Sequence, residues 1–326
     1  MDTKTKYLGL EIESPIVVGS CGLTSDINNL VKMEQAGAGA VVIKSVFEEQ
    51  IIYDIKRNLS MMAPTDNYGM SYEYVASHVS DDSLGKHFEL IKEAKSRLHI
   101  PVVGSINCYS FENWMTYTQR FQEAGCDALE LNMAILPYEP SLSYEDVDRL
   151  FSNIINTLRK SVNIPVSIKV SQNFTDMANF MQRLSWMNIN GITMFNKALN
   201  IDIDIDKMEL THAPSLSNPE DIYDTLRWVA ILSKKLRCDI SASTGVHSAA
   251  DVVKMLLAGA GTVQVVSCLY KNGVDYLRTL NDGLRQWMEE KGFDSLSQFR
   301  GKMAVKSNDE ASMFFRTQFM KHFAQI

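Results

Sequence analysis

Two lysines lie within apolar segments, where a charged side chain is costly. Lys44 belongs to the run AVVIKSV at 40–46, and Lys169 belongs to VSIKV. An ammonium group buried among Val and Ile is strongly unfavourable unless it is paired or neutralised. One interpretation is a buried ion pair, for instance with Glu130. The other is two cations that converge on an electron-rich ligand, such as a flavin ring edge or a substrate carboxylate, and the equivalent places of the two lysines favour it.

Three asparagines close other apolar segments of the same kind. Asn107, Asn132 and Asn196 each stand at the end of a short hydrophobic run. A side-chain amide both donates and accepts hydrogen bonds, which suits the edge of a planar heterocycle. A single asparagine is more often a turn or capping residue. Three at equivalent positions indicate a polar ligand site.

The elements that must position these residues form a repeated unit of strand, turn and amphipathic helix. We expect strands at 16–20, 40–46, 102–107, 128–132, 166–170, 191–195, 239–243 and 262–266. We expect helices at 25–37, 84–97, 111–124, 144–160, 175–187, 219–235 and 248–258, with a terminal helix at 274–291. Eight such units predict an α/β fold, a (β/α)8 TIM barrel, as a single domain over 1–326 with a short N-terminal extension and a C-terminal helical tail. The alternative, an open doubly wound sheet, lacks a GxGxxG motif after the first strand.

Two features place a binding site at the C-terminal ends of these strands. The longest predicted loop, at 47–83, is of the length that binding loops and lids have. The segment 241–256 has a small turn with Gly245 that leads into a helix, and the segment 262–273 follows with a strand and Ser267. Late strands of such barrels often bind phosphate through backbone N–H groups.

Composition excludes several classes of function. The net charge is −7 and the pI is about 5.5, which argues against nucleic acid as the main partner. The five cysteines form no CxxC pair, so we expect no metal site. No signal peptide and no apolar run of about 18 residues is evident. We therefore expect a cytoplasmic protein without membrane attachment.

Several sequence blocks together resemble one family. IESPIVVGSCG, AVVIKSV, DNYGM, LELN, VSIKV, MFNKALN, ISASTGV and VQVVSCL resemble, in this order, the conserved blocks of the cytosolic dihydroorotate dehydrogenases, over roughly 7–290. The resemblance implies an FMN flavoprotein of pyrimidine biosynthesis that oxidises dihydroorotate to orotate and takes a hydride onto FMN. It also implies a homodimer. The electron acceptor stays open among fumarate, a quinone and an iron–sulfur flavoprotein partner that passes electrons to NAD, and the quinone is the least favoured.

The resemblance implies a role for each predicted site residue. The implied FMN-binding residues are Gly19, Ser20, Lys44, Ser45, Asn107, Asn132, Lys169, Thr244, Gly245, Val266 and Ser267, of which the last four would cradle the phosphate. The implied substrate-binding residues are Lys44, Asn67, Gly69, Met70, Asn132 and Asn196.

One departure from the family pattern affects the chemistry. The family carries Cys or Ser as a general base in the loop after the fourth strand, where this chain has Ile135 or Leu136 according to the alignment. Neither accepts a proton, and loss of a positioned base typically costs ~10²–10⁴ in rate. We expect Lys44, Tyr138 and Cys108 to be catalytic, and Cys21 is a further candidate base.

Three alternatives to a dihydroorotate dehydrogenase stay open at this stage. The first is a flavin barrel that acts on another cyclic substrate. The second is a non-catalytic flavin-binding or assembly protein. The third is a flavin-free phosphate-binding lyase or isomerase in which Lys44 or Lys169 forms a Schiff base.

Overall fold

The fold is known from a computed structural model of the chain. The structure describes residues 1–50, 52–53, 72–108, 111–133, 141, 143–197 and 200–307.

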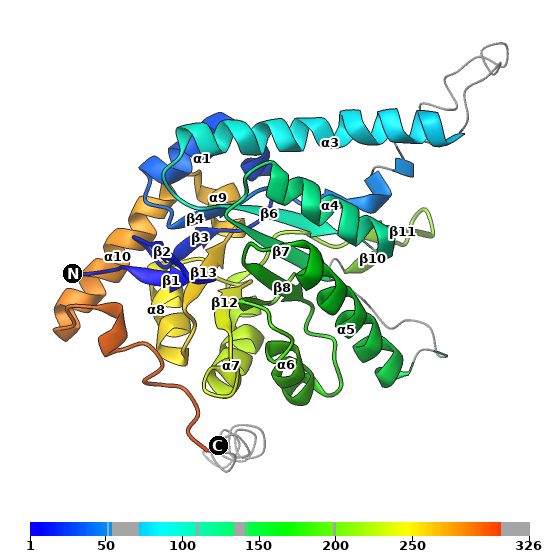
Figure 1. The fold of residues 1–326 in the computed structure, drawn as a ribbon. Helices are drawn as coiled ribbons and strands as arrows, with labels where there is room; N and C mark the ends of the chain where they lie inside the picture. The colour runs from blue at the N-terminus through cyan, green and yellow to red at the C-terminus, as the bar shows by residue number, and fades with distance from the viewer. Residues whose placement is uncertain are drawn as a thin grey trace.

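A closed ring of parallel strands forms the centre of the molecule (Figure 1). The strands are β3 (Ile16–Val18), β4 (Ala40–Val42), β6 (Val102–Asn107), β7 (Ala128–Met133), β8 (Val166–Val170), β9 (Gly191–Met194), β12 (Asp239–Ser243) and β13 (Thr262–Val265). Each strand pairs in parallel with the next, β13 pairs with β3, and β4 pairs with β6. The ring is therefore a barrel, which confirms the predicted fold and excludes the open sheet.

The predicted second strand is interrupted at the residues that carry its polar groups. A short strand β5 (Val46–Phe47) pairs with the end of β6, and residues 43–45 separate it from β4. The backbone N–H of Ser45 donates to the side chain of Ser20 at 2.8 Å instead of to a neighbouring strand. This contact takes Lys44 and Ser45 out of the ladder and turns them toward the barrel mouth.

Helices surround the barrel (Figure 1). They are α1 (Ile27–Gln35), α3 (Tyr72–Arg97), α4 (Phe111–Glu123), α5 (Tyr144–Ser161), α6 (Met177–Ser185), α7 (Ile222–Leu232), α8 (Ala249–Ala258), α9 (Ser267–Asn272) and α10 (Tyr276–Lys291), with 3-10 turns η1 (Gly22–Ser25), η3 (Pro219–Asp221) and η4 (Leu296–Gln298). Asp26 caps α1 by accepting from the backbone N–H of Asn29, and Gly259 ends α8 at a φ of 115°. The prediction that 47–83 is all loop was wrong, because α3 begins at Tyr72 and no proline interrupts it. The short helix α9 was not predicted.

Two apolar layers hold the barrel together. The larger core cluster fills the space between the strands and the helices. A smaller one combines inward-facing barrel residues such as Val17 and Val42 with Tyr7 and Leu8 of the N-terminal hairpin. That hairpin consists of β1 (Thr5–Tyr7) and β2 (Leu10–Ile12), and the N–H of Leu8 donates to Asp239 at 2.9 Å. It therefore closes the N-terminal end of the barrel, and the opposite end is left for ligands.

A second hairpin follows β9 and was also not predicted. Its strands β10 (Ile201–Asp204) and β11 (Glu209–His212) pair antiparallel. Ile203 faces Leu210 across the hairpin, and the two side chains are 58% and 73% exposed. Ile and Asp alternate over 201–206 with the period of a β-strand, and this pattern could have indicated the first strand of the hairpin.

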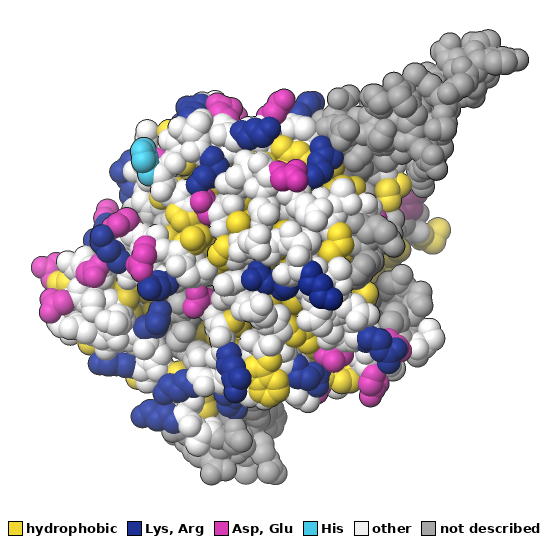
Figure 2. Space-filling view, in the orientation of Figure 1, with side chains coloured by type: hydrophobic (Ala, Val, Ile, Leu, Met, Phe, Trp, Pro, Cys, Tyr) yellow, Lys and Arg dark blue, Asp and Glu magenta, His cyan; other side chains and the backbone are white. Residues whose placement is uncertain are grey.

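The visible surface carries charges of both signs. Basic and acidic side chains are interspersed on the face seen in Figure 2. Within the described residues, no helix has the length and apolarity needed to cross a membrane, and no group of His, Cys, Asp and Glu has the arrangement of a metal site.

Two glycine substitutions test this packing. A Cβ on Gly104 in β6 would press on Phe121 and lie 2.9 Å from the Cys126 sulfur, whereas one on Gly85 in α3 would meet nothing within 4 Å. We expect Gly104→Ala to lower the free energy of unfolding by about 1–3 kcal/mol through overpacking. Gly85→Ala should raise it by up to about 1 kcal/mol through helix propensity. Urea denaturation followed by circular dichroism measures both, and equal effects would contradict the packing described here.

Candidate active site

A cavity of about 540 Å³ opens at the C-terminal ends of the barrel strands. This volume lies within the range of small-molecule and cofactor sites. Seven predicted site residues line it: Ser20, Lys44, Ser45, Asn107, Asn132, Lys169 and Asn196. Cys21, the further candidate base, lines it as well, and five lining residues were not predicted as site residues: Gly22, Phe47, Glu130, Ser171 and Lys197. Glu130 lies in a barrel strand and Ser171 directly follows one, and this position in the sequence could have indicated that both belong to the site.

A buried ion pair forms the floor of the cavity. The ammonium group of Lys169 lies 3.4 Å from Oε1 of Glu130, and the two side chains are 8% and 0% exposed. The ion-pair interpretation of this lysine is therefore confirmed. The pair also lines the cavity, so pairing and ligand binding are compatible at Lys169.

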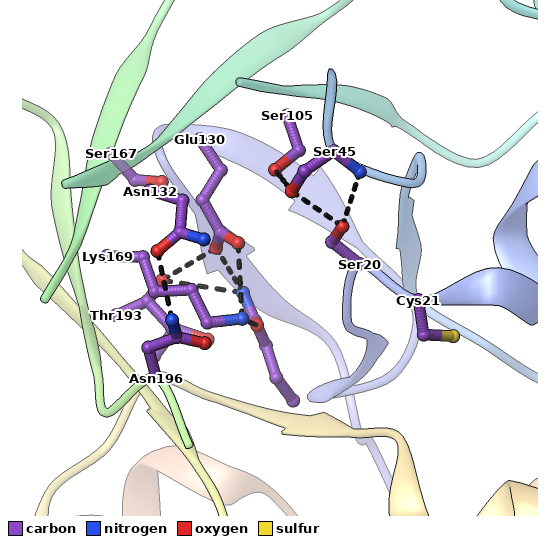
Figure 3. Close-up of polar contacts among 12 residues, drawn as sticks. Ser20, Cys21, Ser45, Ser105, Glu130, Asn132, Ser167, Lys169, Thr193 and Asn196 are labelled. Atoms are coloured by element: carbon purple, nitrogen blue, oxygen red, sulfur yellow. Dashed lines mark hydrogen bonds and ion pairs between the residues drawn. The ribbon is translucent and has the colours of Figure 1, made fainter. Parts of the chain in front are cut away.

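Two uncharged side chains complete this cluster (Figure 3). The hydroxyl of Thr193 donates to Oε2 of Glu130 at 2.9 Å. Gln264 donates from Nε2 to the same oxygen at 2.6 Å and accepts from the Lys169 ammonium at 3.2 Å through Oε1. The carboxylate thus has two donors on one oxygen. No hydrogen bond reaches its Oε1 within the described residues.

The two asparagines next to Lys169 contact each other. Asn196 donates from Nδ2 to Oδ1 of Asn132 at 3.2 Å, and its backbone N–H donates to Val170 at 2.8 Å. In this arrangement, Nδ2 of Asn132 and Oδ1 of Asn196 are left to face the cavity. One donor and one acceptor are what the edge of a heterocycle with C=O and N–H groups requires.

Three serine hydroxyls form a chain on the other side of the cavity (Figure 3). Ser105 lies 2.7 Å from Ser45, and Ser45 lies 2.9 Å from Ser20. Ser105 is fully buried, and Ser45 is its hydrogen-bond partner among the described residues, so Ser105 must donate to avoid a buried unpaired O–H. Ser20 also accepts from the backbone N–H of Ser45. Where Ser45 donates to Ser20, the O–H of Ser20 is left as a donor toward the cavity.

The second predicted lysine has a different environment. Lys44 is half-buried and lines the cavity, and within the described part of the chain it forms no ion pair. Lys197 also lines the cavity, but its ammonium is held by Asp221 at 2.7 Å. That contact contributes to keeping the pKa of the Asp221 carboxyl below its usual value. Lys44 therefore supplies a cation that is available to an anionic ligand.

The predicted phosphate residues lie outside this cavity, at the C-terminal ends of β12 and β13. Thr244 and Gly245 have left-handed φ values of 81° and 80°. A Cβ on Gly245 would collide with the backbone of Ile222, so only glycine fits there. Val266 and Ser267 begin α9, and the Ser267 hydroxyl accepts from the backbone of Ser217 at 2.9 Å. β12 and β13 are neighbours, so the two turns share one edge of the barrel.

Other predicted residues do not line the cavity. Gly19 lies beneath it, where a Cβ would come within 2.9 Å of Val266. Cys108 belongs to the apolar core, and burial and nearby carboxylates raise the pKa of its thiol. Burial also raises the pKa of Cys21, which does line the cavity. A thiol with a raised pKa is a poor base at neutral pH.

Four predicted residues lie outside the described part of the chain. They are Asn67, Gly69, Met70 and Tyr138. The alternative base positions Ile135 and Leu136 lie outside it as well.

The barrel and its polar mouth define an α/β-barrel enzyme whose ligands bind at the C-terminal ends of the strands. Comparison with known proteins identifies the family. The model of the dihydroorotate dehydrogenase family matches residues 66–288, more than half of the chain, and the chain therefore belongs to this family of oxidoreductases.

Relatives match most of the chain at modest identity. The catalytic subunit of dihydroorotate dehydrogenase B (NAD+) from Thermoplasma acidophilum is 28% identical over 304 residues, which is 92% of this chain and 98% of the relative. The protein of that name from Pyrococcus furiosus is 24% identical over 318 residues, again 92% and 98%. A chloroplastic dihydropyrimidine dehydrogenase (NADP+) from Arabidopsis thaliana is 24% identical over 328 residues, 92% of this chain and 76% of the relative.

Thiol alkylation tests the electrostatics of the cysteines. Burial raises the pKa of Cys126, Cys238 and Cys268 to about 12, and raises it for Cys21 and Cys108 as well. An ordinary thiol has a pKa of about 8.5, so at pH 7.5 Cys126, Cys238 and Cys268 should alkylate about 10³-fold more slowly than free cysteine, and Cys21 and Cys108 should also be slower. Because the thiolate fraction below a pKa rises tenfold per pH unit, the rate for the first three should rise about 100-fold between pH 7.5 and 9.5.

Iodoacetamide labelling followed by mass spectrometry measures these rates, and urea-unfolded protein is the control. A cysteine that reacts at pH 7.5 as fast as free cysteine would contradict the account and would identify a thiolate available as a base.

Proposed function

We propose that this chain is an FMN-dependent oxidoreductase that oxidises dihydroorotate to orotate in pyrimidine biosynthesis. The observation that carries the proposal is the cavity wall, where Lys44, Lys169, Asn132 and Asn196 meet at the mouth of a barrel of the dihydroorotate dehydrogenase family. These side chains offer cations, donors and acceptors to a flavin ring and to a cyclic substrate with a carboxylate, C=O and N–H groups.

The floor and the serine side of the cavity fit a flavin ring. Lys169 and the Ser20 hydroxyl point donors at the space, and Asn107 and Asn132 add amides at its wall. Bound FMN would supply the acceptor for a hydride. Its phosphate would lie at the turns formed by Thr244, Gly245, Val266 and Ser267, where glycine is required and backbone N–H groups are available.

The substrate would lie above the flavin, with its carboxylate toward Lys44. The paired amides of Asn132 and Asn196 would then hold the ring C=O and N–H groups of dihydroorotate. Asn67, Gly69 and Met70 would contribute from the long loop. Hydrogen bonds and a cation fixed in advance are the largest source of stabilisation that such a site has for charge developing on the substrate.

Oxidation of a CH–CH bond removes a hydride from one carbon and a proton from the other, so the site needs a proton acceptor. Ile135 and Leu136 cannot serve, and Cys21 and Cys108 have raised pKa values. Tyr138 is the remaining predicted acceptor, and it would take the proton as the phenolate, because a neutral phenol has no basic site for it. The altered base position, together with the similarity to a dihydropyrimidine dehydrogenase, favours a second function, the oxidation of a different cyclic substrate by the same cavity.

The alternative without a flavin has less support. A Schiff base requires a lysine with a free amine. Lys169 is held by Glu130 and Gln264, which leaves Lys44 for that role. A colourless protein after purification would favour this alternative.

We propose that the flavin is reoxidised by an electron-transfer partner protein and that the chain forms a homodimer in the cytoplasm. The relatives named as catalytic subunits support such a partner. The exposed side chains of Ile201, Ile203 and Leu210 support an association, because a monomer gains nothing from an apolar hairpin face in water. Sedimentation at the mass of one chain would contradict the dimer.

Substitution of Lys44 tests the proposed function. We expect Lys44→Ala to reduce orotate formation from dihydroorotate by about 10²-fold or more, because loss of one fixed electrostatic donor has that effect. Lys92→Ala, at an exposed position on α3, is the control and should keep full activity. Orotate absorbance with a soluble dye as acceptor measures both rates. Equal rates in the two variants would contradict the role of Lys44, and an inactive wild-type protein would contradict dihydroorotate as the substrate.

A further inference from the structure

Gln264 is buried at 1% exposure on β13, and its side chain contacts both charges of the cavity floor. Its Oε1 accepts from the Lys169 ammonium at 3.2 Å, and its Nε2 donates to Glu130 Oε2 at 2.6 Å. The opposite amide orientation would turn an NH2 group toward an ammonium and a C=O toward a carboxylate. The charges on both sides therefore fix the orientation of this amide.

Without this amide, the Lys169 ammonium would have Glu130 as its remaining partner. Oε1 of Glu130 has no hydrogen bond within the described residues and lies 3.4 Å from the Lys169 nitrogen, longer than a charge-assisted hydrogen bond of about 2.8 Å. The pair is thus held short of full contact. The attraction that would close it is strong in a buried environment, because little water screens it.

The three N–H groups of the Lys169 ammonium have different surroundings. One is directed at Gln264 and one faces Glu130. The third has no partner among the described residues, and Lys169 lines the cavity. An ammonium that contacted Glu130 fully would withdraw from the ligand.

We propose that Gln264 is a positioning residue that holds the Lys169 ammonium at the cavity surface, against the flavin, and prevents it from closing onto Glu130. The inference rests on the proposed flavin site, but not on dihydroorotate as the substrate. Gln264 does not itself line the cavity, so it acts through Lys169. A flavin gains negative charge on reduction, so a cation held against it stabilises the reduced form and raises the midpoint potential.

The experiment compares the flavin midpoint potential and the FMN affinity of the apoprotein in four proteins: wild type, Gln264→Met, Lys169→Met and the double variant. Methionine matches the length of Gln264 and removes both its acceptor for Lys169 and its donor to Glu130 without a change of charge. We expect Gln264→Met to weaken FMN binding about tenfold and to lower the potential by about 30 mV, a tenfold change for a two-electron couple. The double variant should match Lys169→Met alone, because Gln264 has no effect without the ammonium.

Thr193→Val is the matched control. It removes a hydrogen bond to the same carboxylate and leaves both contacts of the Lys169 ammonium in place. It should lower the melting temperature and leave the potential unchanged. A merely structural role for Gln264 would lower stability in the same way, without a shift of potential.

Each outcome separates the hypotheses. An unchanged potential in Gln264→Met, or additive effects in the double variant, would overturn the inference. If Gln264→Met does not fold, Gln264→Asn replaces it, because the shorter amide withdraws its acceptor from the Lys169 ammonium without a change of charge. The potential should again fall, and an unchanged or higher potential would overturn the inference. A wild-type protein that binds FMN but is not reduced by dihydroorotate would contradict the proposed function alone, and a protein that binds no flavin would contradict both.

Discussion

The charge of Lys169 inside the barrel is the constraint on which the cavity depends. A buried ammonium is stable only with a counter-charge and with hydrogen bonds that replace water. Glu130 supplies the charge from the neighbouring strand β7, and Gln264 and Thr193 supply hydrogen bonds from β13 and β9. Four strands are thus tied together at one level of the barrel. The amides of Asn132 and Asn196 lie next to this level, and the register of these strands sets their positions as well.

A second constraint comes from the backbone near the cavity. The N–H of Ser45 bonds to Ser20, and this leaves the second strand in two pieces and places Lys44 at the mouth. Lys44 and Lys169 are therefore positioned at the cavity in different ways. Lys169 is fixed by side chains inside the barrel, and Lys44 is presented by a break in a strand. A ligand that contacts both lysines meets the neutral ion pair of Lys169 and Glu130 on one side and the positive charge of Lys44 on the other.

Much of the fold could be predicted from the sequence, because parallel strands that are covered on both faces are apolar throughout and alternate with amphipathic helices. The eight strands and Lys44, Lys169, Asn132 and Asn196 were found in this way, and the structure brings these four side chains to one cavity. Gln264 and Thr193 were not found. Their contacts with Glu130 depend on which residues of distant strands lie at the same level, and that register is a tertiary property. The hairpin of β10 and β11 and the first turns of α3 were missed because only the longer apolar segments were read as elements.

The central claim is that the cavity binds FMN and passes hydride from dihydroorotate to it. The most direct measurement is the visible flavin absorbance of the purified wild-type protein, mixed with dihydroorotate in the absence of oxygen. The account predicts a yellow protein that bleaches rapidly as orotate appears, which would mean that a residue other than the usual cysteine or serine accepts the proton. A yellow protein that keeps its colour would contradict dihydroorotate as the substrate, and a colourless protein would contradict the flavin site.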